Sequence, residues 1–168
     1  YSHKFTRSAY SKKSIIVWGA VSDCFGSFFS CFDETSVKAQ KYQNMLEKNF
    51  EPWIEETEEL TQMKWYFLQD NAPTHKAFST EKYLRDNKYN VIDFPPHSPD
   101  LNIIENIWNW IARKVYWGGK TYNSVAELKK SIEHWCSKLP ESLVHTLVAS
   151  MDERLQAVIN KQGGVTHF

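Results

Sequence analysis

The stretch Ser14–Ser22, SIIVWGAVS, constrains the fold more than any other part of the chain. It is a nearly continuous apolar run rich in β-branched residues, which is typical of a strand buried on both faces. Residues 23–26 have the composition of a turn, and residues 27–32 predict a returning strand. Residues 4–7 are a further candidate for a short strand. A sheet with such a buried strand needs helices packed on both of its faces.

The rest of the chain predicts strands and helices in alternation, followed by helices alone. Ser98-Pro99-Asp100 is the strongest helix start, because Ser is a good N-cap, Pro is favoured at the first helical position and Asp suits the positive helix end. We expect this helix to continue to about Trp117. The other predicted elements are a helix from Ser36 and Val37 that Pro52 interrupts, an acidic solvated segment at residues 55–59, strands at residues 64–69 and 90–94, and helices at residues 76–87, from Ser124 and from Pro140, with Gly163 and Gly164 ending the helical region. This order predicts a single α/β domain over residues 1–168, with a mixed sheet flanked by helices.

The chain carries 20 Lys and Arg against 20 Asp and Glu, so its net charge is zero. Proteins that bind nucleic acid on their own are usually basic, because phosphate contacts dominate their affinity. The balance argues against a free-standing nucleic-acid binder, but it does not exclude an enzyme domain whose main DNA contacts lie elsewhere. Three cysteines without C-x-x-C spacing predict reduced thiols in a cytosolic or nuclear protein rather than structural zinc. The chain has no run of about 18 apolar residues, so no membrane span is expected.

Two acids stand where structure alone does not require them. Asp70 follows the predicted strand at residues 64–69, and functional residues of open α/β sheets favour the carboxyl ends of strands. Glu105 is expected one to two turns into the helix that Ser98 opens, among apolar neighbours. Thirty-four residues separate the two acids, which is enough for the chain to return to the same sheet edge.

If the two carboxylates converge, divalent cations are the simplest way to relieve their repulsion. Carboxylates about 4 Å apart repel each other, and burial strengthens the repulsion. Mg²⁺ prefers hard oxygen ligands, and two metal ions about 3.5–4 Å apart can hold both the attacking and the leaving oxygen of a phosphoryl transfer. The structural alternatives are a turn role for Asp70, which Asn71 follows, and a salt-bridged helix acid for Glu105.

Four segments of the chain resemble motifs of mariner-type DNA transposases. Residues 69–75, QDNAPTH, resemble the second-aspartate motif of that family, and residues 95–108, PPHSPDLNIIENIW, resemble its third-acid motif. The 34-residue gap between Asp70 and Glu105 is similar to that of one major branch. Residues 16–22 resemble the second-strand signature, and residues 156–164 resemble the usual carboxyl-terminal end, so the resemblance spans nearly the whole chain.

The resemblance implies a ribonuclease-H-like fold and a triad of acids, Asp, Asp and Glu, that binds two Mg²⁺ or Mn²⁺ ions. On this interpretation Asp70 and Glu105 are the second and third acids, catalytic residues and metal ligands at once. The implied activity is a cut-and-paste transposition reaction: DNA strands are cleaved at transposon ends with water as the nucleophile, and a DNA 3′-hydroxyl then carries out strand transfer. The implied partners are transposon terminal repeats and target DNA, bound by a homodimer in the nucleus.

The chain departs from the family pattern at the first acid. In the family that acid lies on a strand upstream of the one that matches Ser14–Ser22, which here falls before Tyr1. We therefore expect a catalytic domain that is incomplete at its amino terminus, without its first strand and first Asp. Asp23 lies in the predicted hairpin turn and is a poor substitute, and Asp33 and Glu34 are better explained as surface acids. The alternative hypotheses are a domesticated or inactive transposase-derived domain for DNA binding or assembly, and a ribonuclease-H-like nuclease that acts on another nucleic acid.

Five polar residues near the two acids are candidates for DNA contacts. His75 lies near the metal or the scissile phosphate in one interpretation and caps a helix start in the other. Lys76 and Arg113 are suited to phosphate, although a solvated surface position is the better explanation for them. The full set of candidates is Asn71, His75, Lys76, Asn102 and Arg113. His134, Cys136 and His145 fall on amphipathic patterns and are expected to be core or surface residues rather than metal ligands.

Overall fold

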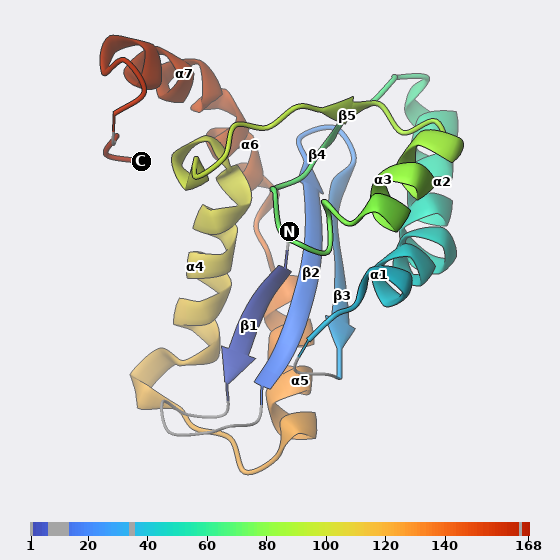
Figure 1. The fold of residues 1–168 in the computed structure, drawn as a ribbon. Coiled ribbons are helices and arrows are strands. Elements are labelled where there is room, and N and C mark those ends of the chain that lie inside the picture. Colours follow the sequence, from blue (N-terminus) through green and yellow to red (C-terminus); the bar gives the residue numbers. More distant parts are fainter. Residues whose placement is uncertain (1, 7–13, 34–35, 165) are drawn as a thin grey trace. The chain divides into compact units, whose positions relative to one another are not determined.

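The computed structural model describes residues 2–6, 14–33, 36–164 and 166–168. The chain divides into two compact units, whose helices and strands are labelled in Figure 1. The first unit is Glu34–Pro96 together with Tyr1, and the second combines Ser2–Asp33 with His97–Phe168. Both units contain strands and helices, as the α/β interpretation predicts. The prediction of one structural domain over residues 1–168 stays a prediction.

The second unit contains a three-stranded antiparallel sheet in the order β1-β2-β3. Its strands are β1 (Ser2–Thr6), β2 (Ser14–Ser22) and β3 (Gly26–Phe32). The predicted hairpin of β2 and β3 is confirmed, and Gly26 adopts a φ of 77° in its turn, a conformation that favours glycine. β1 confirms the short strand predicted near residue 4, although Arg7 lies outside the described residues.

β1 pairs with β2 on the side away from β3, so a strand already precedes the apolar strand in this chain. Its five residues are Ser, His, Lys, Phe and Thr, none of them an acid. The prediction that the family's first Asp lies elsewhere is not tested by this strand and stays a prediction.

Helices cover the sheet of the second unit, and α4, α5 and α6 all contact β2 (Figure 1). The helix expected from Ser124 is confirmed, because Ser124 Oγ accepts a hydrogen bond from Glu127 N at 3.1 Å. The helix expected from Pro140 is two helices that meet at Ser150. The helical elements are η2 (Pro99–Leu101), α4 (Ile103–Val115), η3 (Trp117–Gly119), α5 (Val125–Cys136), α6 (Glu141–Ala149) and α7 (Met151–Asn160).

Trp108 of α4 is the centre of the packing between that helix and the sheet. Its side chain is 1% exposed, and its ring centre lies 5.7 Å from those of His3 and Phe29 and 6.5 Å from that of Phe5. Gly19 of β2 makes this approach feasible. A Cβ atom at Gly19 would lie 2.8 Å from Trp108 Cη2 and 2.9 Å from two ring carbons of Phe29, closer than carbon atoms pack.

The first unit begins with one continuous helical segment of three parts. These are α1 (Ala39–Met45), the π-helical turn η1 (Leu46–Phe50) and α2 (Glu51–Thr61). The prediction that Pro52 interrupts the helix is wrong, because Pro52 lies in the first turn of α2, directly after the π-helical turn. Such a turn widens the backbone where a proline cannot donate its hydrogen bond. The expected cap at Ser36 is also wrong, since the helix begins after Lys38.

The first unit also contains a short parallel strand pair, β4 (Phe67–Leu68) and β5 (Val91–Ile92), with α3 (Phe78–Asp86) between them in sequence. Both strands are confirmed but shorter than predicted. An aromatic cluster packs beside them, with the Phe50 and Phe67 ring centres 5.6 Å apart. Tyr83 and Tyr89 both donate hydrogen bonds to Glu51 Oε1, at 2.6 and 2.9 Å. Within the described residues, no helix is long and apolar enough to cross a membrane.

We predict that Gly19→Ala lowers the free energy of unfolding by about 1–3 kcal/mol, because the added methyl group must displace two packed aromatic rings. Urea denaturation followed by tryptophan fluorescence measures the change. Ser27→Ala, at an exposed position of the same hairpin, is the matched control and should stay within about 0.5 kcal/mol. Equal stability of Gly19→Ala and the unmodified protein would contradict the packing described for Trp108.

Candidate active site

Asp70 lies directly beyond the carboxyl end of β4 and is held by its own loop. Its Oδ1 accepts a hydrogen bond from Ala72 N at 3.0 Å and lies 2.5 Å from His75 Nδ1. An ionised carboxylate can only accept, so the ring nitrogen of His75 donates. Both contacts use Oδ1, and within the part of the chain that the structure describes Oδ2 has no hydrogen-bond partner. The turn role and the functional role proposed for Asp70 are therefore compatible.

The surroundings of Asp70 keep it ionised. Burial by itself raises the pKa of Asp70, but the hydrogen bond and charge of His75 and the amide of Ala72 outweigh it, and the pKa lies below its usual value. The side chain of Asp70 is 34% exposed, so one carboxylate oxygen remains accessible. An ionised, pre-oriented and accessible carboxylate is a suitable ligand for a hard cation.

His75 is a buried support for Asp70. The residue is 3% exposed, and its ring centre lies 4.7 Å from that of Tyr42. Tyr42 Oη in turn donates to Oε1 of the buried Gln69 at 3.1 Å. Asn71 connects the same loop to the segment after β5, because its Nδ2 donates a hydrogen bond to the Phe94 carbonyl at 2.9 Å. The segment from residue 69 to residue 75 is thus fixed from both sides of Asp70.

Glu105 lies in the first turn of α4, not one to two turns into a helix as predicted. Ser98 and Pro99 open only the single 3₁₀ turn η2, and Asn102 then adopts an extended conformation, with φ −109° and ψ 99°. Asn102 is the true N-cap of α4, and its Oδ1 accepts a hydrogen bond from Ile104 N at 3.4 Å. Glu105 is therefore the third residue of α4, at its positive end. An Asn followed three residues later by a Glu is a capping signal, and it could have located this start.

Three of the predicted DNA-contact residues have partners within the protein. The His75 and Asn102 side chains are each 3% exposed and serve an acid or a helix end, and Asn71 bonds to a backbone carbonyl. Lys76 is exposed, 3.9 Å from Glu81, and Arg113 is exposed in the last turn of α4. Contact with DNA stays a prediction for all five residues.

The convergence of Asp70 and Glu105 also stays a prediction. Asp70 belongs to the first unit and Glu105 to the second. Among the described residues, no group of three or more His, Cys, Asp and Glu side chains is arranged to hold a metal ion.

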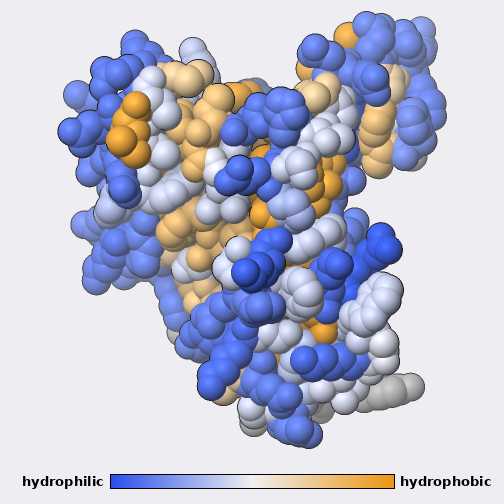
Figure 2. Space-filling model, turned by 180° about the vertical axis from the view of Figure 1, so that it is seen from behind, coloured by the Kyte–Doolittle hydropathy of each residue, from blue (hydrophilic) through white to orange (hydrophobic). Residues whose placement is uncertain are grey.

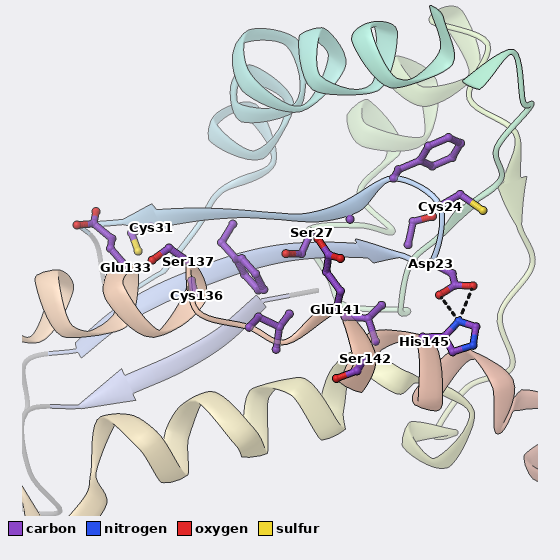
Figure 3. Close-up of a pocket in the computed structure, with 16 residues that line it drawn as sticks. Asp23, Cys24, Ser27, Cys31, Glu133, Cys136, Ser137, Glu141, Ser142 and His145 are labelled. Atoms are coloured by element: carbon purple, nitrogen blue, oxygen red, sulfur yellow. Dashed lines mark hydrogen bonds and ion pairs between the residues drawn. The ribbon is translucent and has the colours of Figure 1, made fainter. Parts of the chain in front are cut away.

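A separate cavity of about 950 Å³ lies in the second unit, between the β2–β3 turn and helices α5 and α6 (Figure 3). Asp23 lines it and pairs with His145 of α6, with Nδ1 2.9 and 3.2 Å from the two carboxylate oxygens. Burial raises the pKa of Cys31 to about 11 and that of Cys136 to about 12, so both remain neutral thiols. Asp33 pairs with Lys129 at 3.0 Å, and Glu34 lies outside the described residues. None of these contacts links Asp23 or Asp33 to Glu105.

We predict that His75→Ala destabilises the protein by about 2 kcal/mol, because it removes a buried hydrogen bond to a charged group and leaves space beside Tyr42. Chemical denaturation measures the loss. Lys76→Ala, at the exposed neighbouring position, is the control and should change stability by less than about 0.5 kcal/mol. If both variants were equally stable, the support that His75 gives to Asp70 would be energetically unimportant.

Comparison with protein families gives a match over most of the chain. Residues 3–129 match the family of DDE superfamily endonucleases. The chain is 34% identical over 164 residues to the transposable element Tc3 transposase of Caenorhabditis elegans, an alignment that covers 98% of this chain and 49% of that protein. The chain thus spans about half the length of the curated relatives it matches.

Comparison with solved structures shows the same fold. The crystal structure of the catalytic domain of Mos1 mariner transposase superposes with a TM-score of 0.84 at 17% identity, covering 99% of this chain and 82% of that one. The Mos1 mariner paired end complex with Mn superposes with a TM-score of 0.79 at 18% identity, covering 95% of this chain and 47% of that one. The predicted ribonuclease-H-like α/β fold is confirmed by this likeness.

Proposed function

The chain belongs to the DDE superfamily of endonucleases, among the Tc1/mariner-type transposase catalytic domains, and from this we propose that it is the strand-cleaving and strand-joining core of a cut-and-paste DNA transposase. The observation that carries the proposal is that neighbouring groups hold Asp70 ionised and in a fixed orientation. A carboxylate beyond a strand end has its pKa lowered and one oxygen fixed by His75 and Ala72. A residue needed only for the turn would not require the buried imidazole.

Asp70 and Glu105 are the proposed ligands for two Mg²⁺ or Mn²⁺ ions. Their carboxylates supply the hard oxygen atoms that these ions prefer, and Asp70 is ionised with Oδ2 accessible. Glu105 is half-buried in the first turn of α4. The residues present therefore suit divalent cations. The Mos1 paired end complex was solved with Mn, which agrees with this choice of metal.

In the proposed reaction, water attacks a phosphodiester at the transposon end and breaks the bond to the 3′ oxygen. The released 3′-hydroxyl then attacks a phosphodiester of the target DNA. Bound divalent cations stabilise the charge on the attacking and leaving oxygens. The chain's own contribution is to hold the carboxylates: His75 fixes Oδ1 of Asp70, and the Asn102 cap fixes the helical turn that carries Glu105.

The proposed partners are duplex DNA and a second copy of the protein. Lys76 and Arg113 are the exposed basic residues nearest in sequence to the two acid motifs, and they are the proposed phosphate contacts. The zero net charge indicates that most of the DNA affinity comes from outside these 168 residues. A Mos1 relative has been solved as a paired end complex, which supports assembly as a dimer on two transposon ends. Such a protein would act in the nucleus.

A second candidate function is DNA binding or assembly without catalysis. The observation that favours it is β1, which carries no acid although it lies beside β2. If no other segment supplied the third carboxylate, the metal site would stay incomplete. A transposase-derived domain of this kind would keep its fold and its DNA partner but lose strand cleavage.

We predict that Asp70→Asn and Glu105→Gln in the full-length protein each lower Mg²⁺-dependent nicking of a terminal-repeat duplex by about 100-fold or more, as expected for loss of several kcal/mol of metal-assisted stabilisation. Gel analysis of a labelled duplex measures the rate. Glu55→Gln, at an exposed acid of α2, is the control and should leave the rate unchanged.

Two outcomes separate the candidate functions. Nicking by the unmodified protein that both substitutions abolish supports the catalytic function. Salt-dependent duplex binding without nicking, unaffected by Asp70→Asn, supports the second candidate and contradicts the first.

A further inference from the structure

Arg154 of α7 is a buried cation that the site described so far does not use. The residue is 3% exposed, and its guanidinium donates in three directions. Nε donates to Ser150 Oγ at 2.9 Å, Nη1 to the Asp100 carbonyl at 2.7 Å, and Nη2 to Asn106 Oδ1 at 3.0 Å. Two of these contacts lie on either side of the segment that carries Asn102 and Glu105.

Burying this charge is costly, and no ion pair from the described part of the chain offsets the cost. Within residues 2–6, 14–33, 36–164 and 166–168, no carboxylate lies within 4.0 Å of the guanidinium. Burial lowers the pKa of Arg154, although Asp100 opposes the shift, and an arginine remains charged in any case. A buried charge held by neutral acceptors is weak support for stability, so another reason for its position is needed.

α7 has little apolar packing that would place Arg154 there by default. Arg154 is its only buried residue, whereas Leu155 and Ile159 are 46% and 67% exposed. Hydrophobic as well as hydrophilic surface is visible on α7 at the upper right of Figure 2. The helix contacts η2 and α6. Its attachment to the segment before α4 therefore depends largely on the polar contacts of Arg154.

The carboxyl-terminal residues add to the same attachment. Thr166 Oγ1 donates to Asp100 Oδ2 at 2.7 Å, and the Phe168 ring centre lies 4.9 Å from Arg154 Cζ. The 3₁₀ turn η2 is thus held at its backbone by Arg154 and at its side chain by Thr166. Asn106, the residue directly after Glu105, is held by Arg154 as well.

We infer that Arg154 is a positioning residue, which clamps η2 and the first turn of α4 so that Glu105 is presented in one orientation. The inference rests on the proposed function, because it assigns Arg154 to the ligand geometry of Glu105. A flexible 3₁₀ turn followed by an extended residue would otherwise let the end of α4 fray. Arginine suits the task because its rigid planar group reaches three acceptors at once, which lysine cannot do.

The test uses the full-length protein and compares Arg154→Met with the unmodified chain. Hydrogen exchange measured by mass spectrometry should become at least about tenfold faster in peptides covering residues 98–106, and stay unchanged in those covering residues 108–115. Mn²⁺ affinity, measured from the electron paramagnetic resonance signal of the free ion, should weaken about tenfold, as for loss of an outer support of a metal ligand.

Four further variants make the result specific. Gln156→Met changes an exposed residue of the same helix, whose Nε2 bonds only to Asn160 within the described chain, and should alter neither measurement. Asn106→Leu removes one acceptor from the other side and should reproduce the faster exchange. In the double variant that combines Asn106→Leu with Arg154→Met, the effect on hydrogen exchange should be smaller than the sum of the effects of the two single substitutions. Arg154→Lys keeps the charge but not the three-way contact. Its hydrogen exchange and Mn²⁺ affinity should therefore lie between those of Arg154→Met and those of the unmodified protein.

The outcomes distinguish this inference from the proposed function. If Glu105→Gln left Mn²⁺ affinity unchanged, the proposed metal site would be wrong. If Glu105→Gln weakened Mn²⁺ binding while folded Arg154→Met kept normal exchange or normal affinity, the positioning role would be overturned and the metal site would stand. If Arg154→Met did not fold, Asn106→Leu would decide by the same two criteria.

Discussion

The close approach of Trp108 to Gly19 determines how the second unit is built. A bare glycine in β2 lets an indole from α4 lie against the strand, and the rings of His3, Phe5 and Phe29 complete its surroundings. This contact fixes the middle of α4 on the sheet. Glu105 lies three residues before Trp108, so this packing determines where the acid lies. The Asn102 N-cap and the contacts of Arg154 determine its orientation.

The two acids are held by different physical means. Asp70 is fixed over a short distance in sequence, by an amide two residues away and an imidazole five residues away. Glu105 depends on contacts from far along the chain, because Arg154 of α7 holds the residues around it. Local hydrogen bonds can pre-orient Asp70 as soon as its loop forms, whereas the orientation of Glu105 requires the carboxyl-terminal helix to be in place.

Sequence patterns predicted the elements better than their ends. The apolar run at Ser14–Ser22 and the capping residue Ser124 gave correct boundaries, because burial and capping act locally. The helix start at Ser98 was wrong because two start signals overlap, and Asn102 rather than Ser98 caps the α-helix. Pro52 was misjudged because a π-helical turn accommodates it. The motifs identified Asp70 and Glu105, but no periodicity could reveal that His75 and Arg154 are buried beside their segments, since such contacts depend on tertiary structure.

The distribution of buried polar groups links these observations. Among the described residues, the buried polar side chains include Gln69 and His75, which flank Asp70, and Asn102 and Arg154, which support the segment of Glu105. Each of them costs desolvation free energy that an apolar side chain of similar size would avoid. A sequence selected for stability alone has no reason to gather them around two carboxylates from separate parts of the chain. Their placement agrees with the proposed function, in which phosphoryl transfer with two metal ions requires a fixed carboxylate geometry.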